Sequence, residues 1–276
     1  MRKSPLWQLS WIVLCAGAVL VIALGAAAWP SLSQHRLLLL LRPTQISLTP
    51  TGTPAPQLNW QVGAYADDEA TNIVGMQTTI RTQIPSAIAD RTADYFWIGA
   101  YLADRSFIQI GYAITWFDHS PRWFYCTFDP SGVKGACPQG PDHSAGSEGS
   151  WHTYTLQAAP GETSGTWTWT AQVDGKTVGS LSTHSGTTMA SHIGVFAEQS
   201  AFTPHAPSNV LGPVEFRPAI EMATAGNPNH FSAPQDARAM YLPDQACPPY
   251  GIAISGTNDV RLGSGLPCLL NGSDLW

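Results

Sequence analysis

The chain has few charged residues: Asp, Glu, Lys and Arg together make up 12% of its 276 residues. It contains 22 Pro, 25 Gly and 11 Trp instead, a composition typical of short strands and turns rather than long surface helices. An excess of basic residues is also missing, since the formal net charge is -6. Because nucleic-acid binding requires a basic patch or stripe, no nucleic-acid partner is expected.

The common catalytic and metal-binding patterns are absent as well. The sequence has no Gly-x-Ser-x-Gly elbow and its eight histidines are scattered, so we expect no metal site and no cofactor. Asp67-Asp68-Glu69 could begin a calcium site, although an acidic turn is the commoner origin of such a triplet. Retaining glycosidases need two carboxylates about 5 Å apart, and no expected strand has acidic residues two positions apart. Sugar cleavage of that kind is excluded, whereas sugar binding stays open.

The first residues carry an export signal. Arg2 and Lys3 precede an apolar run from Trp11 to Trp29, whose length of about 19 residues lies between a secretory signal and a membrane helix. Residues 1–30 are therefore predicted to be a signal peptide or a membrane anchor, and both alternatives stay open. A retained anchor would contact the membrane with its basic end inside, so the rest of the chain is expected to be secreted or at the cell surface.

The remainder of the chain divides by composition into three parts. Residues 31–58 form a Pro- and Thr-rich segment, which predicts an extended stalk. Residues 59–220 contain short strand-like runs between turn residues, and residues 167–173 alternate apolar and polar before the hairpin signal Asp174-Gly175. This pattern predicts an all-β sandwich. Residues 221–276 are rich in Gly and Pro and are expected to be an appendage stabilised by a disulfide.

Four cysteines lie beyond the apolar run: Cys126, Cys137, Cys247 and Cys268. An even number behind an export signal indicates disulfides, and sequence neighbours give the simplest pairing, Cys126 with Cys137 and Cys247 with Cys268. Three pairings are formally possible. A zinc site is the competing interpretation, but no pair has a short metal-ligand spacing.

A glutamine lies in the middle of an apolar strand predicted over residues 107–113. Successive strand residues point to opposite faces, so Gln109 shares a face with Gly111, whereas Ile110 lies on the other. The Gln109 side combines an amide that donates and accepts with small residues that leave room for the backbone of a ligand. A solvated sheet face would explain the amide equally well.

Several short motifs occur in an order known from one family. They are Asn59-Trp60, Trp97-Ile98-Gly99, Ile108-Gln109-Ile110-Gly111, Trp123-Phe124-Tyr125 and Glu198. This order resembles the glutamic peptidases, or eqolisins, which are secreted acid endopeptidases. The resemblance implies a concanavalin-like jelly-roll β-sandwich in which a glutamine and a glutamate on the concave face carry the chemistry. Gln109 would take the glutamine position and help to stabilise the oxyanion of a tetrahedral intermediate.

The glutamate position of the family is not matched. In the family, the catalytic glutamate begins a strand motif with a second acidic residue four positions later, and Glu198 aligns with that second residue. Gly194 then stands at the catalytic position, about 13 Å along the strand from Glu198. Glu198 is either a displaced catalytic acid or a structural carboxylate, and the structural alternative is favoured.

These observations predict an extracellular β-sandwich that binds an extended polymer, polysaccharide or peptide, on its concave face. Gln109 and Glu198 are the central residues of that face, and the further candidate ligand-binding residues are Asn59, Trp97, Trp123 and Tyr125. The alternative is a glutamic-type acid endopeptidase in which Gln109 and Glu198 are catalytic. A third alternative is a structural surface domain without catalytic function.

Overall fold

The computed structural model describes most of the chain beyond residue 57. The described ranges are 58–67, 72–86, 88, 92–102, 104–128, 143–163, 166–183, 189–201, 211–242 and 250–276. Within these ranges the chain forms strands and no helix, which confirms the all-β prediction. The strands are β1 (Leu58–Asp67), β2 (Ile73–Arg81), β3 (Thr92–Leu102), β4 (Phe107–Thr115), β5 (Asp118–Phe128), β6 (Trp151–Pro160), β7 (Trp167–Val173), β8 (Lys176–Thr183), β9 (Ala190–Ala201), β10 (Val214–Phe216), β11 (Glu221–Thr224), β12 (Asn227–Ser232), β13 (Arg238–Leu242), β14 (Tyr250–Ile254) and β15 (Val260–Ser264).

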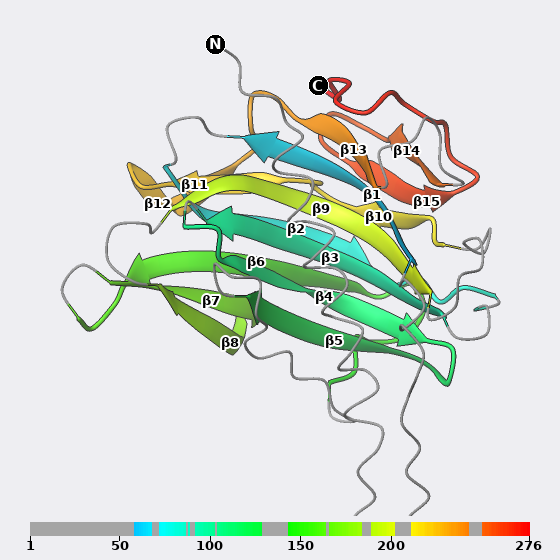
Figure 1. The fold of residues 1–276 in the computed structure, drawn as a ribbon, viewed down its shortest axis with the longest axis horizontal. Coiled ribbons are helices and arrows are strands. Elements are labelled where there is room, and N and C mark those ends of the chain that lie inside the picture. Colours follow the sequence, from blue (N-terminus) through cyan, green and yellow to red (C-terminus); the bar gives the residue numbers. More distant parts are fainter. Residues whose placement is uncertain are drawn as a thin grey trace, which may run out of the picture.

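The first layer is an antiparallel sheet in the order β13-β1-β9-β3-β4-β5 (Figure 1). Nearly every residue of its central strands β3, β4 and β9 is buried. A strand that is buried on both faces reads as a continuous apolar run rather than as an alternating one. Both faces of this sheet are therefore packed against other atoms.

The second layer is built around β2. One edge of β2 pairs with β6, which continues to β7 and β8, and the other edge pairs with β10 and β11. The alternation predicted for β7 is confirmed, since Trp169 and Ala171 are buried in the main core. The predicted hairpin is also present, with positive φ angles of 50° at Asp174 and 76° at Gly175. Two positive φ angles are what a type I′ turn requires.

The main core lies between the two layers. It combines Ile98, Ile110 and Val195 of the first sheet with Tyr154 and Trp169 of the second. All five side chains are at most 1% exposed. Burial of this contiguous apolar cluster is the main source of stability for the sandwich.

The C-terminal part is more than an appendage. In the range 221–276, β13 extends the first sheet beside β1, while β14 and β15 extend the second beside β10. Ile252, Val260 and Leu262 are buried in the main core. The sequence did not indicate that these strands belong to the sandwich, because each strand supplies only two or three residues to the core.

Several predictions fall outside the described residues. These include the signal or anchor over 1–30, the stalk up to residue 57, and Cys137 and Cys247. Cys126 and Cys268 are each disulfide-bonded, but the predicted pairing stays a prediction. Among the described residues, no helix is long and apolar enough to cross a membrane.

Candidate functional site

The candidate residues lie on the side of the first sheet that faces away from the second layer. Tyr95, Trp97 and Phe196 pack there in a cluster separate from the main core. Gln109 pairs with Gly99 of β3, and Glu198 pairs with Tyr95 of β3. Because Tyr95 and Gly99 lie on one face of β3, Gln109 and Glu198 share this side of the sheet. We call this side the Gln109 face. The two residues therefore lie on one surface of one sheet, as the family resemblance implied.

Gln109 and Glu198 are nevertheless far apart on that face. Gln109 pairs with Gly99 of β3, and Gly99 pairs with Gly194 of β9, so the residue level with Gln109 is Gly194. Glu198 lies four residues further along β9, a distance of roughly 13 Å at about 3.3 Å per residue. The amide of Gln109 and the carboxyl of Glu198 cannot act on the same bond from these positions.

Aromatic rings fill the space that small residues were expected to leave for a ligand. A Cβ atom at Gly194 would lie 2.7 Å from the ring of Phe196, and one at Gly63 would lie 2.2 Å from it. The Phe196 ring in turn lies 4.3 Å from that of Trp97, measured between ring centroids. The glycines of this face therefore accommodate the protein's own rings, which corrects the expectation of an open surface beside Gln109.

The carboxyl of Glu198 is buried and holds two hydrogen bonds. Glu198 is 1% exposed. Trp97 Nε1 donates to its Oε2 at 3.2 Å, and Ser200 Oγ donates to its Oε1 at 3.0 Å. Burial raises the pKa of Glu198 to about 7, against the lowering effect of these two hydrogen bonds. The group therefore changes its protonation state near neutral pH.

Two further polar side chains flank Glu198, one on each neighbouring strand. Gln61 of β1 and Tyr95 of β3 are both in register with it. Side chains opposite each other in a sheet have Cβ atoms about 4.5–5.5 Å apart. Both amide atoms of Gln61 and the hydroxyl of Tyr95 are buried without a hydrogen-bond partner. Unsatisfied buried polar groups are rare and call for a functional or solvent-based explanation.

Gln61 and Tyr95 were missed by sequence reasoning. The available signal was a single polar residue, Gln61, between the apolar Trp60 and Val62 of β1. The proximity of Gln61 to Glu198 depends on the pairing of β1 with β9, which are more than 120 residues apart in the sequence, and that of Tyr95 depends on the pairing of β3 with β9. We call Gln61, Tyr95, Trp97, Glu198 and Ser200 the Glu198 cluster.

The other predicted ligand-binding residues are divided between the two faces. Trp97 lies on the Gln109 face and is 2% exposed, while the backbone of Asn59 pairs with Ser200. Trp123 and Tyr125 lie on the opposite face, next to the second layer, because they pair with Tyr112 and Ile110 of the main core. The prediction that these two aromatics surround Gln109 is therefore wrong.

Trp123 and Tyr125 have packing roles where they lie. The Trp123 ring stacks on His143 with centroids 3.8 Å apart. A Cβ atom at Gly179 of β8 would lie 2.1 Å from the Tyr125 ring, so that ring covers Gly179. These two contacts attach the strand β5 to His143 and to β8.

A second buried carboxyl lies between the layers. Gln199 Nε2 donates to Oδ1 of Asp94 at 2.8 Å, and the hydroxyl of Tyr250 donates to Gln199 Oε1 at 2.9 Å. Burial raises the pKa of Asp94 to about 7, with the Gln199 hydrogen bond acting in the other direction. This chain links β3, β9 and β14 inside the sandwich. Within the described residues, no group of three or more His, Cys, Asp or Glu could hold a metal ion.

Comparison with known proteins gives structural neighbours only. No family model and no curated protein matches the chain. Scytalido-glutamic peptidase with a transition state analog inhibitor is 16% identical over 75% of this chain and 98% of that chain, with a TM-score of 0.49. SCP-B, a member of the eqolisin family of peptidases in complex with the tripeptide Ala-Ile-His, has the same identity and coverage with a TM-score of 0.42. A Bacillus licheniformis β-glucanase is 11% identical over 70% of this chain and 67% of that chain, with a TM-score of 0.30.

The structural neighbours are thus glutamic peptidases and glucanases. They include a family 16 endo-glucanase from Bacteroides ovatus, which is 12% identical. At these levels of identity the likeness concerns the fold and not the activity.

Proposed function

We propose that the chain is a β-sandwich that binds an extended polymer, polysaccharide or peptide, and does not hydrolyse it with Gln109. The observation that argues against hydrolysis is the Phe196 ring beside Gly194, which leaves no room for a catalytic side chain level with Gln109. General acid–base catalysis requires a carboxyl within hydrogen-bond reach of the attacking water or the leaving group. The residues level with Gln109 on the neighbouring strands are Gly99, Gly194 and Cys126, and none has a carboxyl.

The half-buried border of the Gln109 face is the favoured binding surface. Tyr65, Tyr101 and Met240 are partly exposed there. The Tyr101 ring stacks on Phe107 with centroids 4.3 Å apart, which fixes its orientation. Rigid aromatic side chains suit both sugar rings and peptide side chains, since they offer apolar area on which either can pack. We define Tyr65 and Tyr101 as the aromatic border.

The second candidate function is hydrolysis by the Glu198 cluster. Here the specific observation is that Gln61 and Tyr95 flank a buried carboxyl and have unpartnered polar atoms. A carboxyl whose pKa is raised can move a proton to or from water, and an amide beside it can stabilise an oxyanion. In this alternative Gln61 takes the role that the family resemblance gives to Gln109.

Co-sedimentation and proteolysis assays on the full chain separate these functions. The binding proposal expects retention on insoluble glycans or denatured protein between pH 4 and 7, without cleavage. Tyr101→Ala should weaken retention by about three- to tenfold, the effect of one aromatic contact. Phe117→Ala is the matched control, because Phe117 is 48% exposed in the turn between β4 and β5.

Each other outcome selects a different function. Cleavage that is lost in Glu198→Gln and Gln61→Ala but kept in Gln109→Ala would select the Glu198 cluster as a hydrolytic site. Cleavage that is lost in Gln109→Ala would contradict both proposals and favour the mechanism implied by the family resemblance. Absence of both binding and cleavage would leave a structural surface domain.

A further inference from the structure

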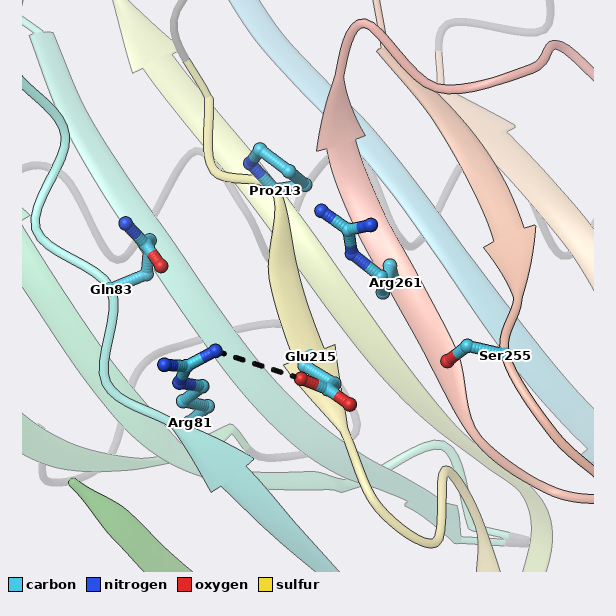
Figure 2. A pocket seen from close by; sticks show the side chains of 6 residues that line it. All are labelled: Arg81, Gln83, Pro213, Glu215, Ser255 and Arg261. Atoms are coloured by element: carbon cyan, nitrogen blue, oxygen red, sulfur yellow. Dashed lines mark ion pairs between the residues drawn. The ribbon is translucent and has the colours of Figure 1, made fainter. Parts of the chain in front are cut away.

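A polar pocket lies on the outer side of the second layer, away from the Gln109 face (Figure 2). Its volume is about 410 Å³. Six residues line it: Arg81, Gln83, Pro213, Glu215, Ser255 and Arg261. None of them belongs to the Glu198 cluster or the aromatic border, so the pocket is independent of the proposed function.

Strand pairing brings the charged residues of the pocket together. β10 lies between β2 and β15, with Phe216 paired to Ile80 and Glu215 paired to Arg261. Phe216 and Ile80 are buried in the main core, so the residues next to them in sequence, Glu215 and Arg81, point outward. Figure 2 shows the side chains of Arg81 and Arg261 on either side of Glu215. The sheet thus presents two guanidinium groups around one carboxylate.

The pocket has more hydrogen-bond donors than its own residues satisfy. Arg261 is exposed and has no ion pair or hydrogen bond with any described residue. Arg81 reaches Glu215 only at 3.9 Å. Ser255 Oγ is buried without a partner. A guanidinium presents five donors, and a hydroxyl can donate one more.

Glu215 does not offset these donors, because it is already paired outside the pocket. Arg217 forms an ion pair with it and bonds Asp259 at 2.9 Å on its other side. The lining therefore keeps a local positive balance in a chain whose net charge is -6. A ligand that fits must supply acceptor oxygens and negative charge.

We propose that this pocket binds the carboxylate of an acidic sugar residue in a polysaccharide. The planar fork of Arg261 matches a carboxylate in two parallel hydrogen bonds, and Arg81 and Ser255 can complete its coordination. Trp151 lies beside Arg81 on β6 and is 39% exposed. The guanidinium of Arg217 lies 5.2 Å from its ring centroid, and the rest of the ring offers an apolar surface for a sugar ring. An exposed aromatic next to paired cations favours a glycan over a small inorganic anion.

Calorimetric titration of the full chain with tetragalacturonate tests this proposal. We expect binding that weakens as salt rises, because the contact is charge-based. Arg261→Ala should weaken binding about tenfold or more, the usual effect of losing a charge-assisted hydrogen bond. Arg261→Lys keeps the charge but loses the fork, so an intermediate affinity is expected. Lys176→Ala is the matched control, because Lys176 is an exposed cation at the start of β8.

Neutral and sulfated sugars separate the possible sources of binding. Cellotetraose should not bind at the concentrations that saturate tetragalacturonate. Binding of a sulfated disaccharide in preference to tetragalacturonate would overturn the assignment to a carboxylate. Equal affinity of wild type and Arg261→Ala for tetragalacturonate, or no binding by the folded wild type, would overturn the site itself. Circular dichroism of each variant shows that it is folded, which is expected since Arg261 has no partner in the described residues to lose.

Discussion

Replacement of Glu198 by glutamine should change how the stability of the protein depends on pH. Glutamine has the same shape and cannot ionise. Its oxygen can accept the hydrogen bond from Trp97, and its amide can donate to Ser200, so the packing of the site is kept. The comparison of Glu198→Gln with wild type therefore isolates the protonation of this one carboxyl.

The direction follows from the raised pKa. Burial raises the pKa of Glu198 from 4.5 to about 7 in the folded protein. The folded state therefore holds the proton more tightly than the unfolded chain. This contribution to stability is complete below pH 4.5, and it is lost as the pH rises towards and through 7. Above pH 7 the folded protein contains a buried negative charge.

A shift of this size corresponds to a few kcal/mol. At about 1.36 kcal/mol per pKa unit, the free energy of unfolding of wild type relative to Glu198→Gln should fall by about 2–3 kcal/mol between pH 5 and pH 8. Urea unfolding followed by tryptophan fluorescence at several pH values measures it. Glu162→Gln is the matched control, since Glu162 is exposed between β6 and β7. Parallel pH curves for wild type and Glu198→Gln would refute the reasoning, because the carboxyl would then be solvated or the site open.

Further predictions concern the second buried carboxyl, Asp94, and two glycines. Asp94→Asn keeps an oxygen for the Gln199 hydrogen bond but cannot ionise. Because burial raises the pKa of Asp94 to about 7, the free energy of unfolding of wild type relative to Asp94→Asn should fall by a few kcal/mol between pH 5 and pH 8. Urea unfolding at several pH values measures this difference, and the same pH dependence in both proteins would contradict the prediction. Gly194→Ala should lower the free energy of unfolding by about 1–3 kcal/mol, because its methyl group would lie 2.7 Å from the ring of Phe196. Gly226→Ala is the matched control and is expected to change the melting temperature little, because a Cβ atom at residue 226 would have no neighbour within 4 Å. Equal changes of melting temperature in the two variants would argue against close packing at Gly194.

The fold class was predictable because its signal is local. The alternation in β7 and the Asp174-Gly175 turn report on neighbouring residues, and both are present in the structure. The shared face of Gln109 and Glu198 was expected from the family resemblance, because alternation within one strand does not relate the faces of two strands. What alternation cannot supply is register between distant strands, and this is why Gln61 was not associated with Glu198.

The two aromatic residues of β5 were misplaced for a related reason. In β5, Trp123, Phe124 and Tyr125 are consecutive aromatics, so apolarity does not show which of them points to which face. Pairing with β4 decides it, since Phe124 pairs with Gly111 and Tyr125 with Ile110. The C-terminal strands were also underestimated, because each buries few residues and gains stability from partners far away in the sequence.

The packing of Phe196 restricts which descendants of this chain could evolve. A longer side chain at Gly194 would have to enter space that the ring already occupies, and the same ring covers Gly63. The carbonyl oxygen of Ala64 would also lie 2.9 Å from a Cβ atom at residue 194. An acid at residue 194 is therefore compatible with this fold only together with a smaller side chain at residue 196 and a shift of the backbone at Ala64.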